Sequence, residues 1–247
     1  TMRGRSEMKI GRIITYLCKL ANLKVKDQDI EKFVNMYKST SESGDIQFKM
    51  VSGKDIAKYY TSDRTYGYRD EMGSLGASCM IDTDKKRFKI YTKNKDKVNL
   101  LIYVNSNDEI LGRALVWKLD ESPCEAKYFM DRVYTSRDSD IYKFINYAKN
   151  QGWLYKFRQG YGVDEAVVFK YNDKKIYGEI KVNLDGDFNK YPFLDTLCFL
   201  SKNKKSLSNL PSKKCFELHD HEYGERERCY DCGGDLKNES WTGDVYL

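Results

Sequence analysis

Apolar residues recur three and four positions apart near the start of the chain, a spacing typical of amphipathic helices. This spacing predicts a helix over residues 8–22 and a second one that begins at Asp27, a fair N-cap residue. Residues 39–44 are polar and predict a loop. We expect residues 1–44 to form an antiparallel helical pair that lies on the rest of the chain, and we expect the native chain to begin at Met8.

The middle of the chain changes to alternating and continuous apolar runs, which predict strands. The expected strands cover residues 46–50, 98–104, 110–119, 128–134, 153–158, 165–171 and 175–183. A short helix is expected over residues 53–60, and a longer one runs from Asp138 or Ser139 to Gln151, where Gly152 ends it. Asn172 and Asp173 predict a tight hairpin turn, whereas residues 87–91 fit either a strand or a helix.

These elements predict an α+β protein with a central mixed or antiparallel sheet. The chain of 247 residues is long enough for one main domain and an appendage. We expect the helical pair at 1–44, the α+β core at 45–200, and a C-terminal element at 201–247. Residues 201–214 predict a basic loop.

Composition narrows the class of protein only a little. There is no apolar run of roughly 18 residues, so no membrane contact is expected, and the start of the chain does not resemble a secretory signal. Seven scattered cysteines indicate a reducing compartment. The net charge of +6 is mild, and it allows binding to nucleic acid or to an acidic protein.

The tail carries the clearest chemical signal. Cys229 and Cys232 form a CxxC followed by two glycines, the pattern of a zinc knuckle, and both histidines of the chain lie just upstream. Cys215 with His219 or His221 would complete a tetrahedral Zn²⁺ site, and which histidine binds stays open. Four such ligands leave no open position, so the site would be structural. The alternatives are a redox CxxC pair and a chance cluster.

Basic residues alternate with aromatic ones at two places where a partner could bind. Aromatic faces stack on bases while nearby cations hold phosphates. The first place is a polar loop with Arg64, Tyr66, Tyr68 and Arg69. The second is the basic loop before Cys215, with Lys202, Lys204, Lys205, Lys213 and Lys214. Residues 153–158 show the same alternation, which there indicates a half-buried strand.

A run of small residues includes Gly73, Ser74, Gly76 and Ser78. Such a run suits either a loop whose N–H groups bind an anionic ligand or a tightly packed turn, and the sequence favours the turn. We assign no catalytic residues. Cys79 has no histidine to activate it, and the strand neighbours Asp131 and Arg132 should point to opposite faces of the sheet.

Residues 98–158 resemble the middle of a GNAT-type acetyltransferase. The matching features are Gly112, Ala114 and Val116 in the second strand of a hairpin, then a third strand, a helix, and the segment 148–153 that ends in Gly-Trp. The resemblance implies a GNAT-like fold and an acyltransferase that uses an acyl-CoA. In that family a glycine-rich loop before the helix binds pyrophosphate, but residues 135–140 here contain no glycine and two aspartates, which would repel it.

A second resemblance covers nearly the whole chain and rests on five segments, residues 8–17, 74–80, 110–119 and 129–134 and the CxxC at 229–232. Their combination is similar to a group of uncharacterised proteins carried by tailed bacteriophages. That resemblance implies the cytoplasm of an infected bacterium, or the virion, as the compartment. We therefore expect an accessory or regulatory protein with a structural zinc site that contacts nucleic acid or a host protein. An acyltransferase on the GNAT-like frame and a structural component of the virion are the alternatives.

Overall fold

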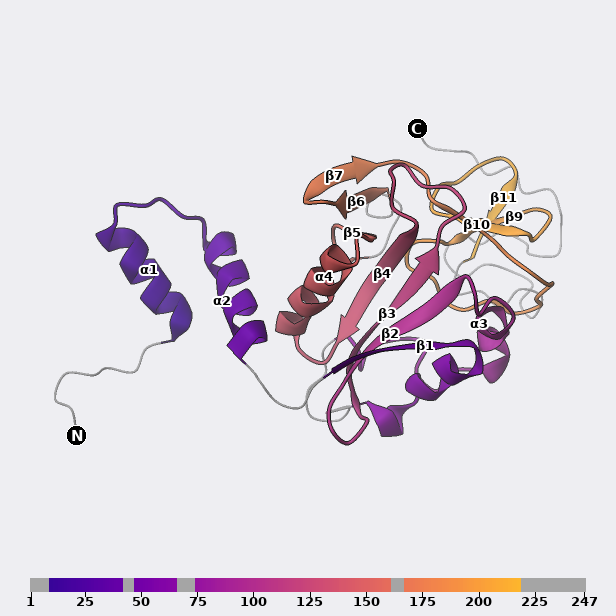
Figure 1. The fold of residues 1–247 in the computed structure, drawn as a ribbon, viewed down its shortest axis with the longest axis horizontal. Coiled ribbons are helices and arrows are strands. Elements are labelled where there is room, and N and C mark those ends of the chain that lie inside the picture. The colour runs from indigo at the N-terminus through magenta and orange to yellow at the C-terminus, as the bar shows by residue number, and fades with distance from the viewer. Residues whose placement is uncertain (1–8, 42–46, 66–73, 161–166, 219–247) are drawn as a thin grey trace, which may run out of the picture.

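The structure is a computed structural model, and it describes residues 9–41, 47–65, 74–160 and 167–218. The chain is α+β, as expected, with a large mixed sheet of seven strands, a second sheet of four strands, and a few helices (Figure 1). The zinc-knuckle part of the expected fold lies beyond residue 218, outside the described residues.

The two N-terminal helices are α1 (Ile10–Leu20) and α2 (Asp27–Ser41). Helix α2 packs against α4 (Ile141–Asn150) and the short helix η4 (Asp138–Asp140), whereas α1 packs against α2. The pair therefore extends to one side of the body (Figure 1). Helix α1 buries none of its residues, although its apolar positions follow the helical spacing.

The large sheet follows the chain in order. Strands β1 (Gln47–Ser52), β2 (Val98–Val104), β3 (Ile110–Lys118) and β4 (Tyr128–Thr135) pair antiparallel. Helix α4 then returns the chain, and Gly152 ends it with φ +66°. The next strand, β5 (Leu154–Lys156), lies parallel to β4.

Two further antiparallel strands, β6 (Val168–Tyr171) and β7 (Lys174–Tyr177), complete the sheet. Asn172 and Asp173 join them with φ of +48° and +61°, which confirms the tight hairpin turn expected there.

Short helices fill the long connection between β1 and β2. They are η1 (Gly53–Tyr59), η2 (Ser62–Arg64), η3 (Lys85–Phe88) and α3 (Lys89–Lys93). Residues 87–91, for which the sequence left strand or helix open, are therefore helical. Phe88, Ile90 and Tyr91 are buried there, so this connection covers one face of the large sheet.

The second sheet corrects two expectations. Residues 175–183 are not one strand, because the chain leaves the large sheet at Gly178, where φ is +149° and a Cβ would lie 2.8 Å from Pro123. Strand β8 (Lys181–Asn183) instead pairs with β10 (Ser206–Ser208), which forms inside the stretch expected to be a loop. With β9 (Phe199–Ser201) and β11 (Cys215–Glu217) they form an antiparallel sheet in the order β11-β9-β10-β8.

The core has two parts, one on each face of the large sheet. Helix α4 covers one face, where Phe144 and Ala148 pack on Leu101, Val116 and Met130. The other face is the larger part. It is covered by the connection between β1 and β2 and by the second sheet, and it includes Tyr91, Trp117, Phe129, Val182 and Leu200. Within the described residues, no helix combines the length and the apolar character of a membrane span.

Candidate functional site

A small polar pocket lies on the face of the large sheet opposite α4. Strand β3 contributes Arg113, strand β4 contributes Asp131, Arg132 and Tyr134, and residues 193–195 close it from the side of the second sheet. Its remaining lining is Tyr60, Ser78, Met80, Ala114 and Leu115. The volume is about 20 Å³, more than the roughly 10–15 Å³ that a single water needs. Charged side chains so concentrated in a protein core need partners.

A β-bulge places Asp131 and Arg132 together in this pocket. Ala114 pairs with Val133, and Val116 pairs with Met130, so Asp131 and Arg132 together lie opposite the single residue between them on β3. The strict alternation of side chains fails at a bulge, because one strand carries an extra residue. The expectation that these two neighbours point to opposite faces was therefore wrong.

Asp131 is a buried carboxylate, with 3% of its surface exposed. Its Oδ1 accepts a short hydrogen bond from the Thr196 hydroxyl and another, of 2.8 Å, from the Arg132 backbone N–H. Burial raises the pKa of Asp131 from 3.8 to about 6, against the opposing effect of the buried Lys156 ammonium. This carboxyl can therefore change its protonation near neutral pH.

Asp195 holds a second group of side chains at the pocket. Its Oδ1 lies 3.0 Å from Arg132 Nη1, and its Oδ2 accepts a hydrogen bond of 2.7 Å from the Tyr134 hydroxyl. Burial and the nearby Asp195 charge raise the pKa of Tyr134 well above 10, so this phenol stays protonated and donates. The Arg132–Asp195 pair is about one-fifth exposed on each side, so solvent reaches these two charges more than the buried Arg113 and Asp131.

Arg113 is a deeply buried charge in the lining of the pocket, with 1% of its surface exposed. Its Nη1 donates to the Tyr59 carbonyl at 2.9 Å, and its guanidinium lies 3.8 Å from the ring centre of Tyr60. Within the described part of the chain, its Nε and Nη2 have no hydrogen-bond partner. Burial lowers the pKa of Arg113, but it remains a cation at any ordinary pH.

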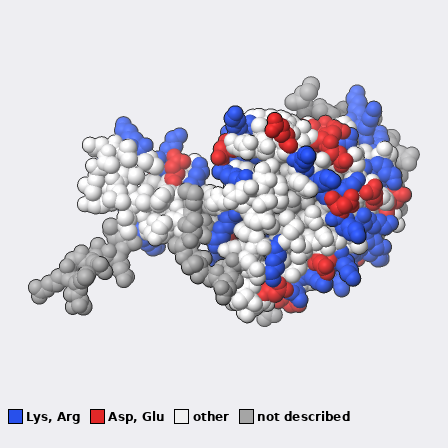
Figure 2. All heavy atoms as spheres, viewed as in Figure 1, with Lys and Arg blue, Asp and Glu red and all other residues white. Residues whose placement is uncertain are grey.

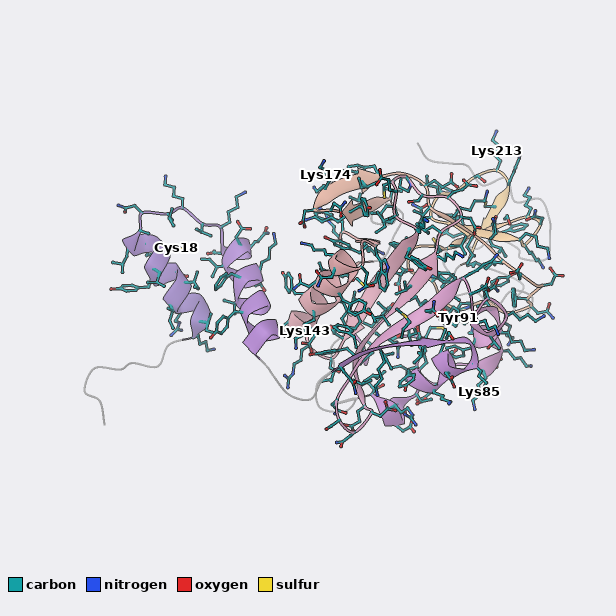
Figure 3. The ribbon with its side chains drawn as sticks, viewed as in Figure 1. Cys18, Lys85, Tyr91, Lys143, Lys174 and Lys213 are labelled. Atoms are coloured by element: carbon teal, nitrogen blue, oxygen red, sulfur yellow. The ribbon has the colours of Figure 1, made fainter. Side chains whose placement is uncertain are left out.

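The lysines expected to bind a partner gather at one end of the second sheet. The Lys202 N–H donates to the Lys214 carbonyl at 2.7 Å, since Lys202 follows β9 and Lys214 precedes β11. Figure 2 shows basic side chains at this end of the molecule, and in Figure 3 Lys213 projects outward beside β11. Lys205 pairs with Asp187 at 3.0 Å, and Lys204 is half-buried with φ +58° in the β9–β10 turn.

Of the aromatic and basic loop, only Arg64 lies in the described residues. Its Nη1 lies 2.7 Å from Asp108 Oδ2, and Lys49 and the Tyr59 hydroxyl approach the same carboxylate. The Arg64–Asp108 ion pair therefore connects η2 with the β2–β3 turn, and the charge of Arg64 already has a partner within the protein. Tyr66, Tyr68 and Arg69 lie outside the described residues.

The described part of the small-residue run packs as a turn against the end of β4. Leu75 N–H donates to the Thr135 carbonyl at 3.1 Å, and the Ser74 hydroxyl accepts from Thr135 N–H at 3.1 Å. Gly76 is half-buried in this turn, and Ser78 lines the pocket. Gly73 lies outside the described residues.

Only Cys215 of the expected zinc ligands falls within the described residues. It is half-buried at the start of β11, and its Sγ lies 3.1 Å from the Ser212 hydroxyl. His219, His221, Cys229 and Cys232 lie outside. Within residues 9–41, 47–65, 74–160 and 167–218, no three His, Cys, Asp or Glu side chains lie in an arrangement that could hold a metal ion.

No functional role for Arg113, Lys156, Asp195 or Thr196 was predicted from the sequence. One signal was available, because Arg113 is the only charged residue within the apolar segment 110–117. A lone charge in a buried strand needs a partner or a ligand. No protein-family model and no curated protein sequence matches this chain. What the two surfaces can do follows from their own chemistry.

Proposed function

We propose that this protein binds nucleic acid through the lysine end of its second sheet, defined as Lys202, Lys204, Lys205, Lys213 and Lys214. One observation carries the proposal. The antiparallel pairing of β9 with β11 brings Lys202 beside Lys214, although they are separated by a hairpin in the chain. Lysines on a rigid sheet edge can follow a row of phosphates, each as a point charge.

Three lysines of this end, Lys202, Lys213 and Lys214, are exposed and can present their charge to a partner, whereas Lys205 pairs with Asp187 at 3.0 Å. Phosphate binding by such lysines releases counterions, so the binding should weaken steeply as salt rises. Contacts of this type carry no base specificity.

The proposal includes a structural Zn²⁺ bound by Cys215, Cys229, Cys232 and one of His219 and His221. Cys215 directly follows Lys213 and Lys214, so a metal-closed tail would fix the backbone that carries these two lysines. In the setting that the phage resemblance implies, this would be an accessory or regulatory protein of the host cytoplasm, or a component of the virion.

The test compares two triple variants that lose the same charge. In the first, Lys202, Lys213 and Lys214 become Ala; in the control, the exposed lysines Lys54, Lys127 and Lys174 become Ala. Figure 3 places Lys174 on the β7 hairpin, apart from Lys213. Fluorescence anisotropy with labelled single- and double-stranded oligonucleotides of about 20 nucleotides reports binding.

We expect the first triple variant to bind at least about tenfold more weakly than the control at low salt. Equal binding by the two variants would contradict the role of the lysine end. If the unaltered protein bound neither oligonucleotide, nucleic acid would be the wrong partner, and an acidic host protein would be the class to test with the same two variants.

A second candidate, an acyltransferase with a GNAT-like frame, is favoured by one observation. The antiparallel order β2-β3-β4 is followed by α4 and by β5 parallel to β4. Against it, groups in the loop that would bind the pyrophosphate already have other contacts. The Ser136 N–H donates to the Leu111 carbonyl at 2.8 Å, and the buried Asp140, at the start of α4, lies 2.9 Å from Lys143. The polar pocket is also far too small for an acyl-CoA. A bound acyl-CoA found by mass spectrometry of the purified protein would reverse this ranking.

A further inference from the structure

We propose that the polar pocket between β3, β4 and residues 193–195 binds the carboxylate group of a small ligand, with the Arg113 guanidinium as its receptor. This site is separate from the lysine end and does not depend on nucleic-acid binding.

The free donors of Arg113 are the ones that a carboxylate needs. Nη1 already donates to the Tyr59 carbonyl, whereas Nε and Nη2 have no partner among the residues that the structure describes. Nε and Nη2 form one edge of the planar guanidinium, and their two N–H groups point in parallel. Such an edge binds the two oxygens of a carboxylate through two parallel hydrogen bonds. Leaving buried donors of a charged group unpaired is costly, so an occupant would stabilise this core.

The charges around the pocket also favour an anion. Three cations, Arg113, Arg132 and Lys156, face two carboxylates, Asp131 and Asp195. Both carboxylates already have partners: Asp131 accepts from Thr196, and Asp195 is held by Arg132 and Tyr134. Among the described residues, neither Arg113 nor Lys156 forms a salt bridge with a carboxylate, although the charge of Lys156 acts on Asp131. A bound anion would balance Arg113.

Size selects between the two common anionic groups. A volume of about 20 Å³ suits the tip of a planar carboxylate better than a tetrahedral phosphate. The rings of Tyr60 and Tyr134 flank the guanidinium, with centres 3.8 Å and 5.9 Å from its central carbon. They leave only its edge for hydrogen bonds. The rest of the ligand would leave the pocket past the partly exposed Arg132–Asp195 pair.

The test uses acetate as the probe on the full chain, with formation of the complex followed by NMR. The Nε–H resonance of Arg113 is assigned by its loss in Arg113→Lys, a variant that keeps the charge but loses the two-pronged edge. Titrations with acetate, acetamide, inorganic phosphate and chloride at constant ionic strength separate the carboxylate from a neutral molecule of the same shape, from a tetrahedral anion and from bulk salt.

We expect acetate to shift the Arg113 Nε–H resonance in a saturable way, and acetamide and chloride to leave it in place. Arg113→Lys should bind acetate roughly tenfold more weakly or worse, judged by the pocket resonances of Tyr60 and Tyr134, and should bind oligonucleotides as the unaltered protein does.

Three results would overturn the proposal. One is an Arg113 Nε–H resonance that acetate does not shift, which would mean that these donors bind only a buried water. Another is an equal response to acetamide. The last is saturation by phosphate alone. If Arg113→Lys does not fold, the Nε–H resonance is assigned in the unaltered protein by its through-bond connection to the Arg113 backbone, and the titrations still decide the question.

Discussion

Asp131 and Arg132, consecutive residues of β4, line the same pocket, because the β-bulge opposite Leu115 turns both toward one face of the sheet. The Arg132 backbone N–H donates to Asp131 Oδ1 at 2.8 Å, while the Arg132 side chain reaches Asp195 at 3.0 Å. Arg132 thus connects the buried carboxylate of Asp131 with the half-buried carboxylate of Asp195. The bulge is the local feature on which the geometry of the pocket depends.

The first prediction concerns the pH dependence of stability through Asp131. Its pKa of about 6 in the folded chain lies above the ordinary value of 3.8, so the folded state holds the proton more tightly. Stability from this group is full below pH 4 and is lost as pH rises through 6. A pKa difference of about 2 corresponds to about 3 kcal/mol. Relative to Asp131→Asn, the unaltered protein should lose about this much unfolding free energy between pH 4 and pH 7.5.

Chemical denaturation of both proteins across that pH range measures the difference. Asp173→Asn is the control, because Lys149 lowers the pKa of this exposed carboxyl and its effect on stability runs in the opposite direction with pH. Parallel stability curves for Asp131→Asn and the unaltered protein would show that folding does not raise the pKa of Asp131.

The second prediction concerns Asp195, the acceptor shared by Arg132 and Tyr134. Asp195→Ala should lower the unfolding free energy by about 2 kcal/mol, since it leaves a largely buried guanidinium and phenol without their acceptor. Asp185→Ala removes a pair with Lys97 whose carboxylate is 68% exposed, and it should cost less than about 1 kcal/mol. Urea unfolding of the two variants provides the comparison, and equal costs would count against a structural role for Asp195.

The third prediction concerns Gly112, where β3 passes under α4. A Cβ there would lie 2.8 Å from Phe144 Cε2 and 2.9 Å from Thr135 Cγ2, both in the buried core. Gly112→Ala should therefore destabilise the protein by about 1–3 kcal/mol. Gly11→Ala, in α1 with its nearest neighbour 3.7 Å away, should instead stabilise by up to about 1 kcal/mol. Thermal unfolding that moves both variants in the same direction would refute this explanation.

The fourth prediction concerns the proposed zinc site. Metal analysis of the purified protein should find about one Zn²⁺ per chain, as four closed ligands imply. Cys229→Ser should lose most of it, while Cys124→Ser, a free cysteine remote from the tail in sequence, should keep it. Unchanged metal content in Cys229→Ser would mean that the ligand assignment is wrong.

The spacing of apolar residues predicted most of the helices and strands, but it could not predict the pocket. The runs that became β2, β3 and α4 were predictable because each buries a continuous apolar face. The break at Gly178 was not, because it depends on Pro123, far away in the sequence. The bulge at Asp131 likewise arises from pairing between strands. Arg113 and Asp195 meet only through the tertiary fold, so no local pattern could join them.

The central claim, that the lysine end binds nucleic acid, is tested most directly by the salt dependence of binding. The logarithm of the association constant for a single-stranded oligonucleotide should fall linearly with the logarithm of salt concentration. The Lys202/Lys213/Lys214→Ala variant should lower that slope by about 2, or roughly 0.7 for each lost phosphate contact, while the control triple variant keeps it. A slope that is the same for all three proteins would contradict the claim.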